Sequence, residues 1–231
     1  RMAAAEALGS IGDARALQPL VRATLRDPAP QVRAHAAGAV AKIEGERAVD
    51  VLVAALADPD YATRLRALEA FETMRALDTT PLETALRDPN IEVRRRAALA
   101  LERVGHLEQL IQRLQSEDPT TQKRAYESFL ELGRAGLVDS VASYVHHASF
   151  EVRALAARAA GELGAVRVAP LLASAMDDES WPVRAAIAEA LGRLRDDKSI
   201  STLVKRLTDP EEPVREAAAE ALTNYPPESL T

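Results

Sequence analysis

Cysteine is absent from the 231-residue chain, which excludes disulfide bonds, thiolate metal sites and a cysteine nucleophile. Aromatic residues make up only 3% of the sequence, although ligand pockets and single-strand nucleic-acid channels depend on aromatic walls. No apolar run approaches the roughly 18–20 residues that a membrane-spanning helix requires. We therefore expect no cofactor, no metal site and no membrane insertion, and we expect a cytoplasmic location.

The sequence also lacks an excess of positive charge, because acidic residues outnumber basic ones, 35 to 29. The net charge is −6 and the pI is near 5.4, whereas phosphate-binding surfaces are usually strongly basic. Residues 1–115 carry 16 basic and 16 acidic side chains, and residues 116–231 carry 13 and 19, so the whole net charge lies in the second half. This balance predicts that nucleic acid is not a partner.

The sequence does contain an internal repeat that is anchored on an arginine. The anchor recurs every 28 to 32 residues, with a degenerate copy at Gln122 and a truncated copy at Arg1. The anchors are Arg33, Arg64, Arg94, Arg153, Arg184 and Arg215. Apolar residues follow at three, seven and ten positions after the anchor, as in Ala36, Val40 and Ile43. This spacing forms one stripe of a 3.6-residue helix, so a helix is predicted around each anchor.

A second helix fills the other half of each repeat and ends at an Asp-Pro turn, because proline cannot continue a helix. The turns are Asp27-Pro28, Asp58-Pro59, Asp88-Pro89 and Asp209-Pro210. Glycines eleven residues after an anchor can end the anchor helix in a left-handed conformation. These glycines are Gly12, Gly105, Gly133 and Gly164. One helix pair cannot bury its apolar face alone, so the pairs are expected to stack on one another.

The pattern resembles HEAT repeats over nearly the whole chain, specifically the short subtype named after phycobilisome lyases. Its proline, turn aspartate and arginine match at Pro19, Asp27 and Arg33, and again at Pro170, Asp178 and Arg184. The resemblance implies a structural ladder of hydrogen-bonded side chains along the turns. The ladder residues are Asp27, Arg33, Asp58, Arg64, Asp88, Arg94, Asp178, Arg184, Asp209 and Arg215. Ser116, Gln122 and His147 depart from this pattern, and losing partners together avoids an unpaired buried charge.

We predict an all-α fold, a right-handed α-solenoid (superhelix) of HEAT-like helix-turn-helix repeats with a period of about 31 residues. A single array is expected over residues 1–231, with a partial N-terminal repeat at 1–12, seven helix pairs over 13–225 and a C-terminal tail at 226–231. Because the partial repeat lacks its first helix, we expect the chain to be part of a longer polypeptide. The short spacing near Gln122 predicts a local irregularity and a changed inter-repeat angle around residues 114–125.

Several residues invite a chemical interpretation but fit a structural one better. Trp181 occupies the same repeat position as Tyr61, Ile91 and Phe150, which we interpret as an apolar staple at a helix start. His146 and His147 are adjacent in the sequence and therefore do not share a helix face, so they predict no metal site. The chain also lacks the His-Glu dipeptides of related helical-repeat di-iron hydroxylases.

One local excess of basic residues stands out on the helix face opposite the apolar stripe. These residues are Arg66, Arg95, Arg96, Arg103, Lys123 and Arg124. The resemblance implies that this face lines the concave surface of the array, where the residues would form a partner-binding patch. Interspersed glutamates such as Glu69 and Glu72 neutralise part of the charge, so an ordinary solvated face remains the alternative.

The sequence favours a non-catalytic protein-interaction scaffold or regulatory module, with a protein partner that carries an acidic or phosphorylated segment. The first alternative is a chromophore-handling subunit like the phycobilin lyases, which share this repeat subtype. The second is a nucleic-acid-binding helical-repeat protein, which the acidic composition disfavours.

Overall fold

The computed structural model describes residues 1–44, 48–74 and 78–230, and these residues form helices and turns without any strand among them. The longer helices are α1 (Met2–Ile11), α2 (Leu17–Arg26), α3 (Pro30–Glu44), α4 (Val49–Leu56), α5 (Tyr61–Met74), α6 (Thr80–Ala85), α7 (Ile91–Arg103), α8 (His106–Leu114), α9 (Pro119–Leu132), α10 (Val138–Ser143), α11 (Phe150–Leu163), α12 (Ala169–Ser174), α13 (Trp181–Leu194), α14 (Ile200–Arg206) and α15 (Glu212–Thr223). Short helical turns are η1 (Ala14–Ala16), η3 (Gly133–Leu137), η4 (Tyr144–His146), η5 (Val166–Val168), η6 (Asp197–Ser199) and η7 (Pro227–Leu230). The predicted all-α class is confirmed.

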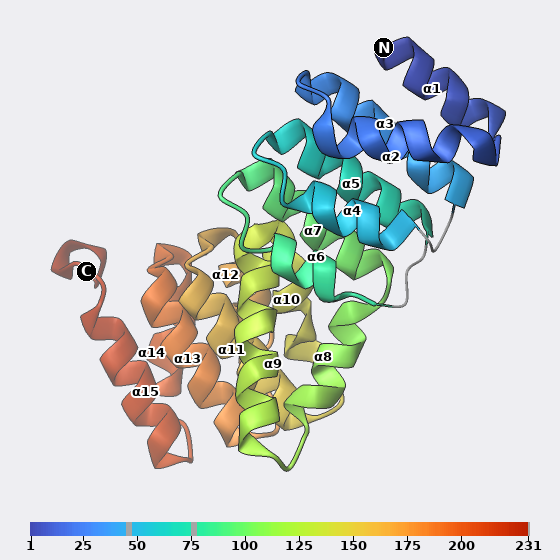
Figure 1. The fold of residues 1–231 in the computed structure, drawn as a ribbon. Helices are drawn as coiled ribbons and strands as arrows, with labels where there is room; N and C mark the ends of the chain where they lie inside the picture. The colour runs from blue at the N-terminus through green and yellow to red at the C-terminus, as the bar shows by residue number, and fades with distance from the viewer. Residues whose placement is uncertain (45–47, 75–77, 231) are drawn as a thin grey trace. The chain divides into compact units, whose positions relative to one another are not determined.

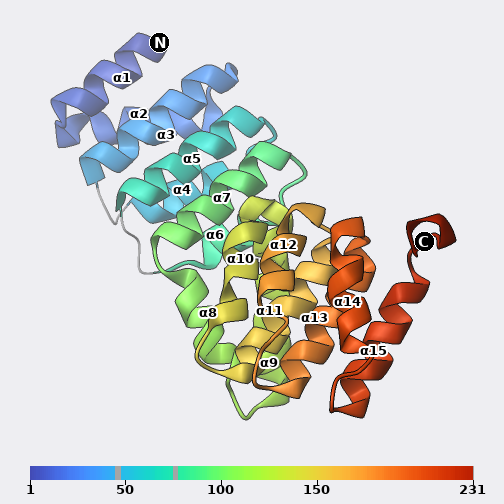
Figure 2. The ribbon, with the colours of Figure 1, turned by 180° about the vertical axis from the view of Figure 1, so that it is seen from behind.

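The chain divides into two compact units, Arg1–His106 (unit 1) and Leu107–Thr231 (unit 2). In unit 1, α1, α3, α5 and α7 pack side by side in one layer, and α2, α4 and α6 form a second layer (Figures 1 and 2). In unit 2, α11, α13 and α15 pack on one another, with α10, α12 and α14 against them. Each unit is therefore a stack of helix pairs, and the predicted helical-repeat architecture is confirmed. The single array over residues 1–231 stays a prediction.

The core of each unit is built on the repeated apolar positions. Three residues after the anchor, Ala36, Ala67 and Ala97 are fully buried, whereas the equivalent Ala4 in α1 is exposed. Seven residues after the anchor, large side chains such as Phe71 and those at positions 101, 129 and 191 (Leu, Phe and Leu) are also buried. Burial of the stripe by the neighbouring pair explains why a helix pair is stable only in the stack.

Glycines set how closely the second helices of unit 2 approach one another. A Cβ atom added to Gly192 would lie 2.6 Å from the Cα of Ala221, and one added to Gly161 would lie 2.8 Å from the Cα of Ala190. No side chain can be accommodated at such separations without a backbone shift. The glycines therefore allow α11, α13 and α15 to pack backbone against backbone.

The predicted glycine caps occur at three of the four positions. Gly12, Gly105 and Gly164 have φ angles of 71°, 73° and 65°, in the left-handed region. The prediction is wrong for Gly133, which has φ −60° and leads into the π-helical turn η3, where Gly136 has φ 120°. The reason is that the helical backbone continues from α9 into η3 and does not end at Gly133, where a Cβ would lie 2.3 Å from Cδ1 of Leu163. This irregular backbone lies downstream of residues 114–125, and the inter-repeat angle there stays a prediction.

The structure also corrects the staple interpretation of the apolar position at the helix starts. Tyr61, Ile91, Phe150 and Trp181 are the first residues of their helices, and each is 43% to 52% exposed. A staple residue instead precedes the capping residue and packs against the first turn. These side chains therefore face solvent at the turns.

Candidate functional site

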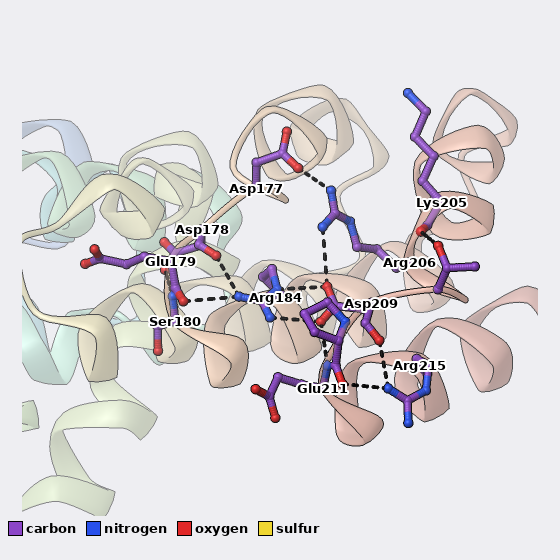
Figure 3. Close-up of polar contacts among 12 residues, drawn as sticks. Asp177, Asp178, Glu179, Ser180, Arg184, Lys205, Arg206, Asp209, Glu211 and Arg215 are labelled. Atoms are coloured by element: carbon purple, nitrogen blue, oxygen red, sulfur yellow. Dashed lines mark hydrogen bonds and ion pairs between the residues drawn. The ribbon is translucent and has the colours of Figure 1, made fainter.

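Four of the anchor arginines hold successive repeats together, whereas Arg94 and Arg215 bond to carbonyl oxygens of their own turns and form no such fork with a described residue. Arg184 donates from Nε and Nη2 to the carboxylate of Asp209 at 2.9 and 2.8 Å, and from Nη1 to the carbonyl oxygens of residues 178 and 179 (Asp and Glu) at 2.9 and 3.1 Å. Figure 3 shows this fork between the start of α13 and the turn before α15. The same forked contact joins Arg33 to Asp58, Arg64 to Asp88 and Arg153 to Asp178, with distances of 2.6 to 2.8 Å.

The carboxylate in each of these contacts comes from the following repeat, not from the arginine's own turn. The own-turn aspartate contributes only its backbone carbonyl, as Asp27 does to Arg33 at 2.9 Å. Asp27 itself receives Arg1, the anchor of the partial repeat, at 2.9 Å. Arg153 is thus a full member of the ladder that sequence analysis left out, since its own turn carries His147 in place of aspartate.

Each aspartate also performs a local task, which is to accept a hydrogen bond from the backbone N–H two residues later. Asp58 accepts from residue 60 at 2.8 Å and Asp178 from Ser180 at 2.9 Å. In the irregular repeats Ser116 accepts through Oγ at 3.2 Å, and His147 accepts through Nδ1 at 3.1 Å. Serine and histidine therefore keep the turn-forming hydrogen bond but lose the charge.

The electrostatics of the ladder follow from burial and pairing. Hydrogen bonding from Arg184 lowers the pKa of Asp209, whose side chain is fully buried. Burial acts to raise the pKa of Asp58 and of Asp178, but the forked arginines and backbone N–H groups outweigh it and hold both pKa values below the ordinary range. The carboxylates therefore stay ionised and paired, which fits the structural role predicted for the ladder.

Three of the six residues of the predicted basic patch form ion pairs within the protein. Arg96 and Arg103 of α7 both bind Glu72 of α5, each with a nearest nitrogen–oxygen distance of 2.9 Å. The Glu72 side chain is only 9% exposed, so these ion pairs belong to the packing of α5 on α7. Arg66 pairs with Glu69 at 2.8 Å, but both side chains are well exposed. Arg95 is exposed on α7.

The remaining two patch residues, Lys123 and Arg124, lie in unit 2, where both are exposed on α9. In unit 1 the structure pairs Arg66 with Glu69, and Arg96 and Arg103 with Glu72. The result is a face of alternating charge in which Arg95 alone among the four patch arginines of unit 1 forms no ion pair with a described residue.

A groove of about 300 Å³ lies beside this face, over α1, α3 and α5. Its lining residues define the Gly38 groove: Glu6, Ala34, His35, Gly38, Ala39, Lys42, Arg66, Glu69 and Ala70. Small residues form much of its lining, and a Cβ added to Gly38 would meet nothing within 4 Å. The groove is open there because glycine leaves space that a side chain would fill.

The groove was not predicted, although the repeat pattern of the sequence contains a signal for it. Five residues after the anchor most repeats carry glutamate, including Glu6 in α1 and Glu69 in α5. Gly38 interrupts that column between them, which creates a gap flanked by two carboxylates. A missing side chain becomes visible only when the repeats are compared position by position.

Two absences among the described residues bear on function. These residues contain no group of three or more histidine, aspartate or glutamate side chains arranged to hold a metal ion. Among the same residues, no helix combines the length and apolar character needed to cross a membrane.

The fold and the ladder define a class of all-α proteins made of stacked helix pairs. The family model described as HEAT repeats matches residues 1–72, 79–144 and 138–223. The chain therefore belongs to the HEAT-repeat family, as the Pro-Asp-Arg spacing predicted. No curated protein matches the sequence.

Several solved structures resemble the chain. Human deoxyhypusine hydroxylase is 24% identical, with 97% of this chain and 89% of that chain covered and a TM-score of 0.42. The CpcE–CpcF complex of phycocyanin lyase from Nostoc sp. PCC7120 is 16% identical, with 97% and 88% covered and a TM-score of 0.39. Importin beta is 18% identical, with 90% of this chain and 35% of that chain covered and a TM-score of 0.40.

Proposed function

We propose that the chain is a non-catalytic protein-interaction module that binds a partner segment on the exposed face of α1, α3, α5 and α7. The observation that carries this proposal is the Gly38 groove, a hollow of about 300 Å³ with small residues in its lining and charged residues around it. Small residues let the backbone of a partner approach closely, and charged residues around such a hollow orient the partner. A cytoplasmic location is part of the same proposal.

The partner segment carries an anionic side chain, either a carboxylate or a phosphate. Lys42 and Arg66 are the lysine and arginine residues of the groove. The ion pair between Arg66 and Glu69 is exposed, with 52% and 39% of the side chains accessible, and such pairs are worth only about 0–1 kcal/mol. An incoming anion can therefore replace Glu69 at Arg66 with little loss. Arg96 and Arg103 remain with the buried Glu72, so they are not part of the proposed contact.

A crosslinking experiment identifies the partner and tests the location of the site together. The chain contains no cysteine, so Glu6→Cys introduces a unique thiol at the groove for a photo-activated crosslinker while keeping both cationic residues. Leu25→Cys is the matched control, because Leu25 is 46% exposed on α2, in the other layer of unit 1. We expect a discrete partner to be crosslinked from position 6 and not from position 25.

Affinity measurements with that partner complete the test. Gly38→Glu restores the glutamate that most repeats carry and fills the groove, so Kd should rise at least about ten-fold while the helix stays intact. Arg66→Glu should weaken binding and reduce its salt dependence, and phosphatase treatment of the partner distinguishes a phosphate from a carboxylate. Unchanged binding by the folded Gly38→Glu and Arg66→Glu proteins would contradict the proposal, as would specific uptake of a bilin in place of a protein.

A further inference from the structure

A second surface with binding character lies at the turns of unit 2. The first residues of α11 and α13, Phe150 and Trp181, are 43% and 44% exposed, and the two helices pack directly on each other. Trp181 is the only tryptophan of the chain. Isolated exposed apolar residues are common on protein surfaces. Here, however, two large aromatic residues recur at one repeat position on neighbouring helices.

The requirements of the helix start do not explain these aromatic residues. At the same repeat position α3 and α9 begin with Pro30 and Pro119, and α15 begins with Glu212. Proline and acidic residues are the types that stabilise a first turn, so an aromatic residue adds nothing to helix formation there. The exposure of Phe150 and Trp181, 43% and 44%, also shows that a large part of each residue is not buried in the core.

An open depression of about 460 Å³ lies at the same turns. Its lining includes His147, three residues before Phe150, and Glu179, two residues before Trp181. The acidic residues Asp177 and Asp178 complete the side next to α13. We call Phe150, Trp181, Asp177, Asp178 and Glu179 the turn-edge surface.

The charge of this surface is negative where it meets solvent. Asp178 is neutralised by the buried Arg153. The side chains of Asp177 and Glu179 are 88% and 91% exposed, although Asp177 also pairs with Arg206 and Glu179 lies 3.7 Å from Arg153, so a cationic partner competes with these arginines. Glu151 in the first turn of α11 is also exposed. Unit 2 as a whole carries the acidic excess, since residues 116–231 contain 13 basic and 19 acidic side chains. Exposed aromatic faces next to carboxylates suit a partner that presents both apolar and cationic side chains.

We propose that the turn-edge surface binds an extended segment of a partner protein in which lysine or arginine alternates with large apolar residues. The apolar side chains cover Phe150 and Trp181, and the cationic side chains enter the depression and pair with Glu179 and Asp177. This site is separate from the Gly38 groove and does not depend on it.

The single tryptophan provides a direct measurement. The probe is a short synthetic peptide of alternating lysine and leucine, added to the full chain, and the reference is the same peptide with glutamate in place of lysine. We expect saturable binding of the lysine peptide, with Trp181 emission shifted to shorter wavelength and with affinity falling as salt increases. The glutamate peptide should leave the emission unchanged.

Variants locate the binding, measured by calorimetry so that loss of the fluorophore does not matter. Phe150→Ser, Trp181→Ser and Glu179→Lys should each raise Kd at least about five-fold. Val204→Ser removes another exposed apolar side chain of unit 2 and Asp197→Lys reverses another exposed acid, and both should leave Kd unchanged. Circular dichroism checks that every variant is folded. The proposal is overturned if the peptide does not saturate, if both peptides bind equally, or if the control variants weaken binding as much as the turn-edge variants.

Discussion

The regular and irregular parts of unit 2 are built on the same repeat but are held together differently. In the regular part, α11 to α15, Arg153 and Arg184 fork onto carboxylates of the following turns. In the irregular part, residues 116–149, Gln122 replaces the arginine and donates from Nε2 to the carbonyl oxygen of Leu114 at 2.9 Å. The comparison shows that the turn itself needs only a hydrogen-bond acceptor, whereas the connection between repeats needs the charge pair.

The helices of the irregular part also pack less closely than those of the regular part. Gly161 and Gly192 let α11, α13 and α15 approach closely, whereas Leu130 stands at the equivalent position of α9. Backbone-to-backbone approach is correspondingly more extensive between α11 and α13 than between α9 and α11. The charge pair that forms one rung of the ladder and the glycine that allows close helix packing are therefore both missing from the same repeat. Their loss makes this repeat the weaker section of unit 2.

Acidification should have the largest effect, because it acts on every rung at once. The folded-state pKa values of Asp58, Asp178 and Asp209 are lowered, so their contribution to stability is fully present above the ordinary aspartate pKa of about 3.9 and is lost as pH falls. The free energy of unfolding should therefore decrease from about pH 5 downward. Urea titrations at several pH values test this, and the double variant Asp178→Asn with Asp209→Asn should show a shallower pH dependence. An equal slope in both proteins would contradict the role of the ladder.

Removing one carboxylate tests the regular part directly. Asp209→Ala leaves Arg184, a side chain only 10% exposed, without its partner, and breaking such a pair costs about 3–5 kcal/mol. His147→Ala, at the equivalent position of the irregular part, removes one hydrogen bond to the turn and should cost about 0.5–1.5 kcal/mol. Chemical denaturation of both variants measures the two losses in free energy of unfolding. Comparable losses would show that the charge pair contributes no more than one hydrogen bond of a turn.

Glycine packing gives the next largest effect. Gly192→Ala places a Cβ 2.6 Å from the backbone of α15, and overpacking of this kind costs about 1–3 kcal/mol. Gly38→Ala is the control with the opposite sign. Its Cβ meets nothing within 4 Å, so the gain in helix propensity should raise the free energy of unfolding by about 0.5–1 kcal/mol. The same sign for both substitutions would refute the distinction between the two glycines.

Restoring a rung should have the smallest effect. Gln122→Arg together with His147→Asp recreates the pair of the regular repeats within unit 2. The double-mutant cycle should give a favourable coupling of about 0.5–3 kcal/mol, because the two groups satisfy each other only when both are present. Denaturation of the two single variants and the double variant supplies the cycle, and additive effects would mean that the turns are too far apart to pair.

Much of the fold could be predicted because the same residue pattern recurs in successive repeats. The anchor register places the buried stripe, and three predicted left-handed glycines are found. The ladder was predicted as a set of residues, but its connection to the following repeat was not, because spacing along the chain does not reveal which turn a long side chain reaches. The cap prediction was wrong for Gly133 because the helical backbone runs on into η3, where Gly136 takes the positive φ, and the repeat spacing does not show this shift.

The candidate sites were harder to predict, for physical reasons that the residues make clear. Glu72 lies eight residues after its anchor, and nothing in the sequence shows that it would be buried between Arg96 and Arg103. The Gly38 groove depends on an absent side chain. The exposure of Trp181 depends on its place as the first residue of α13, directly after the capping residue Ser180 and not before it. Such features follow from tertiary geometry and not from residue type.

Native-state hydrogen exchange tests the central claim most directly, namely that charge-paired, glycine-packed repeats are the stable part of unit 2. Exchange rates of individual amides report the free energy of local opening. The account predicts that amides of α11 and α13 exchange only through the largest openings, while those of α9 and α10 exchange through smaller openings of higher frequency. Equal protection in α9, α10, α11 and α13 would contradict it.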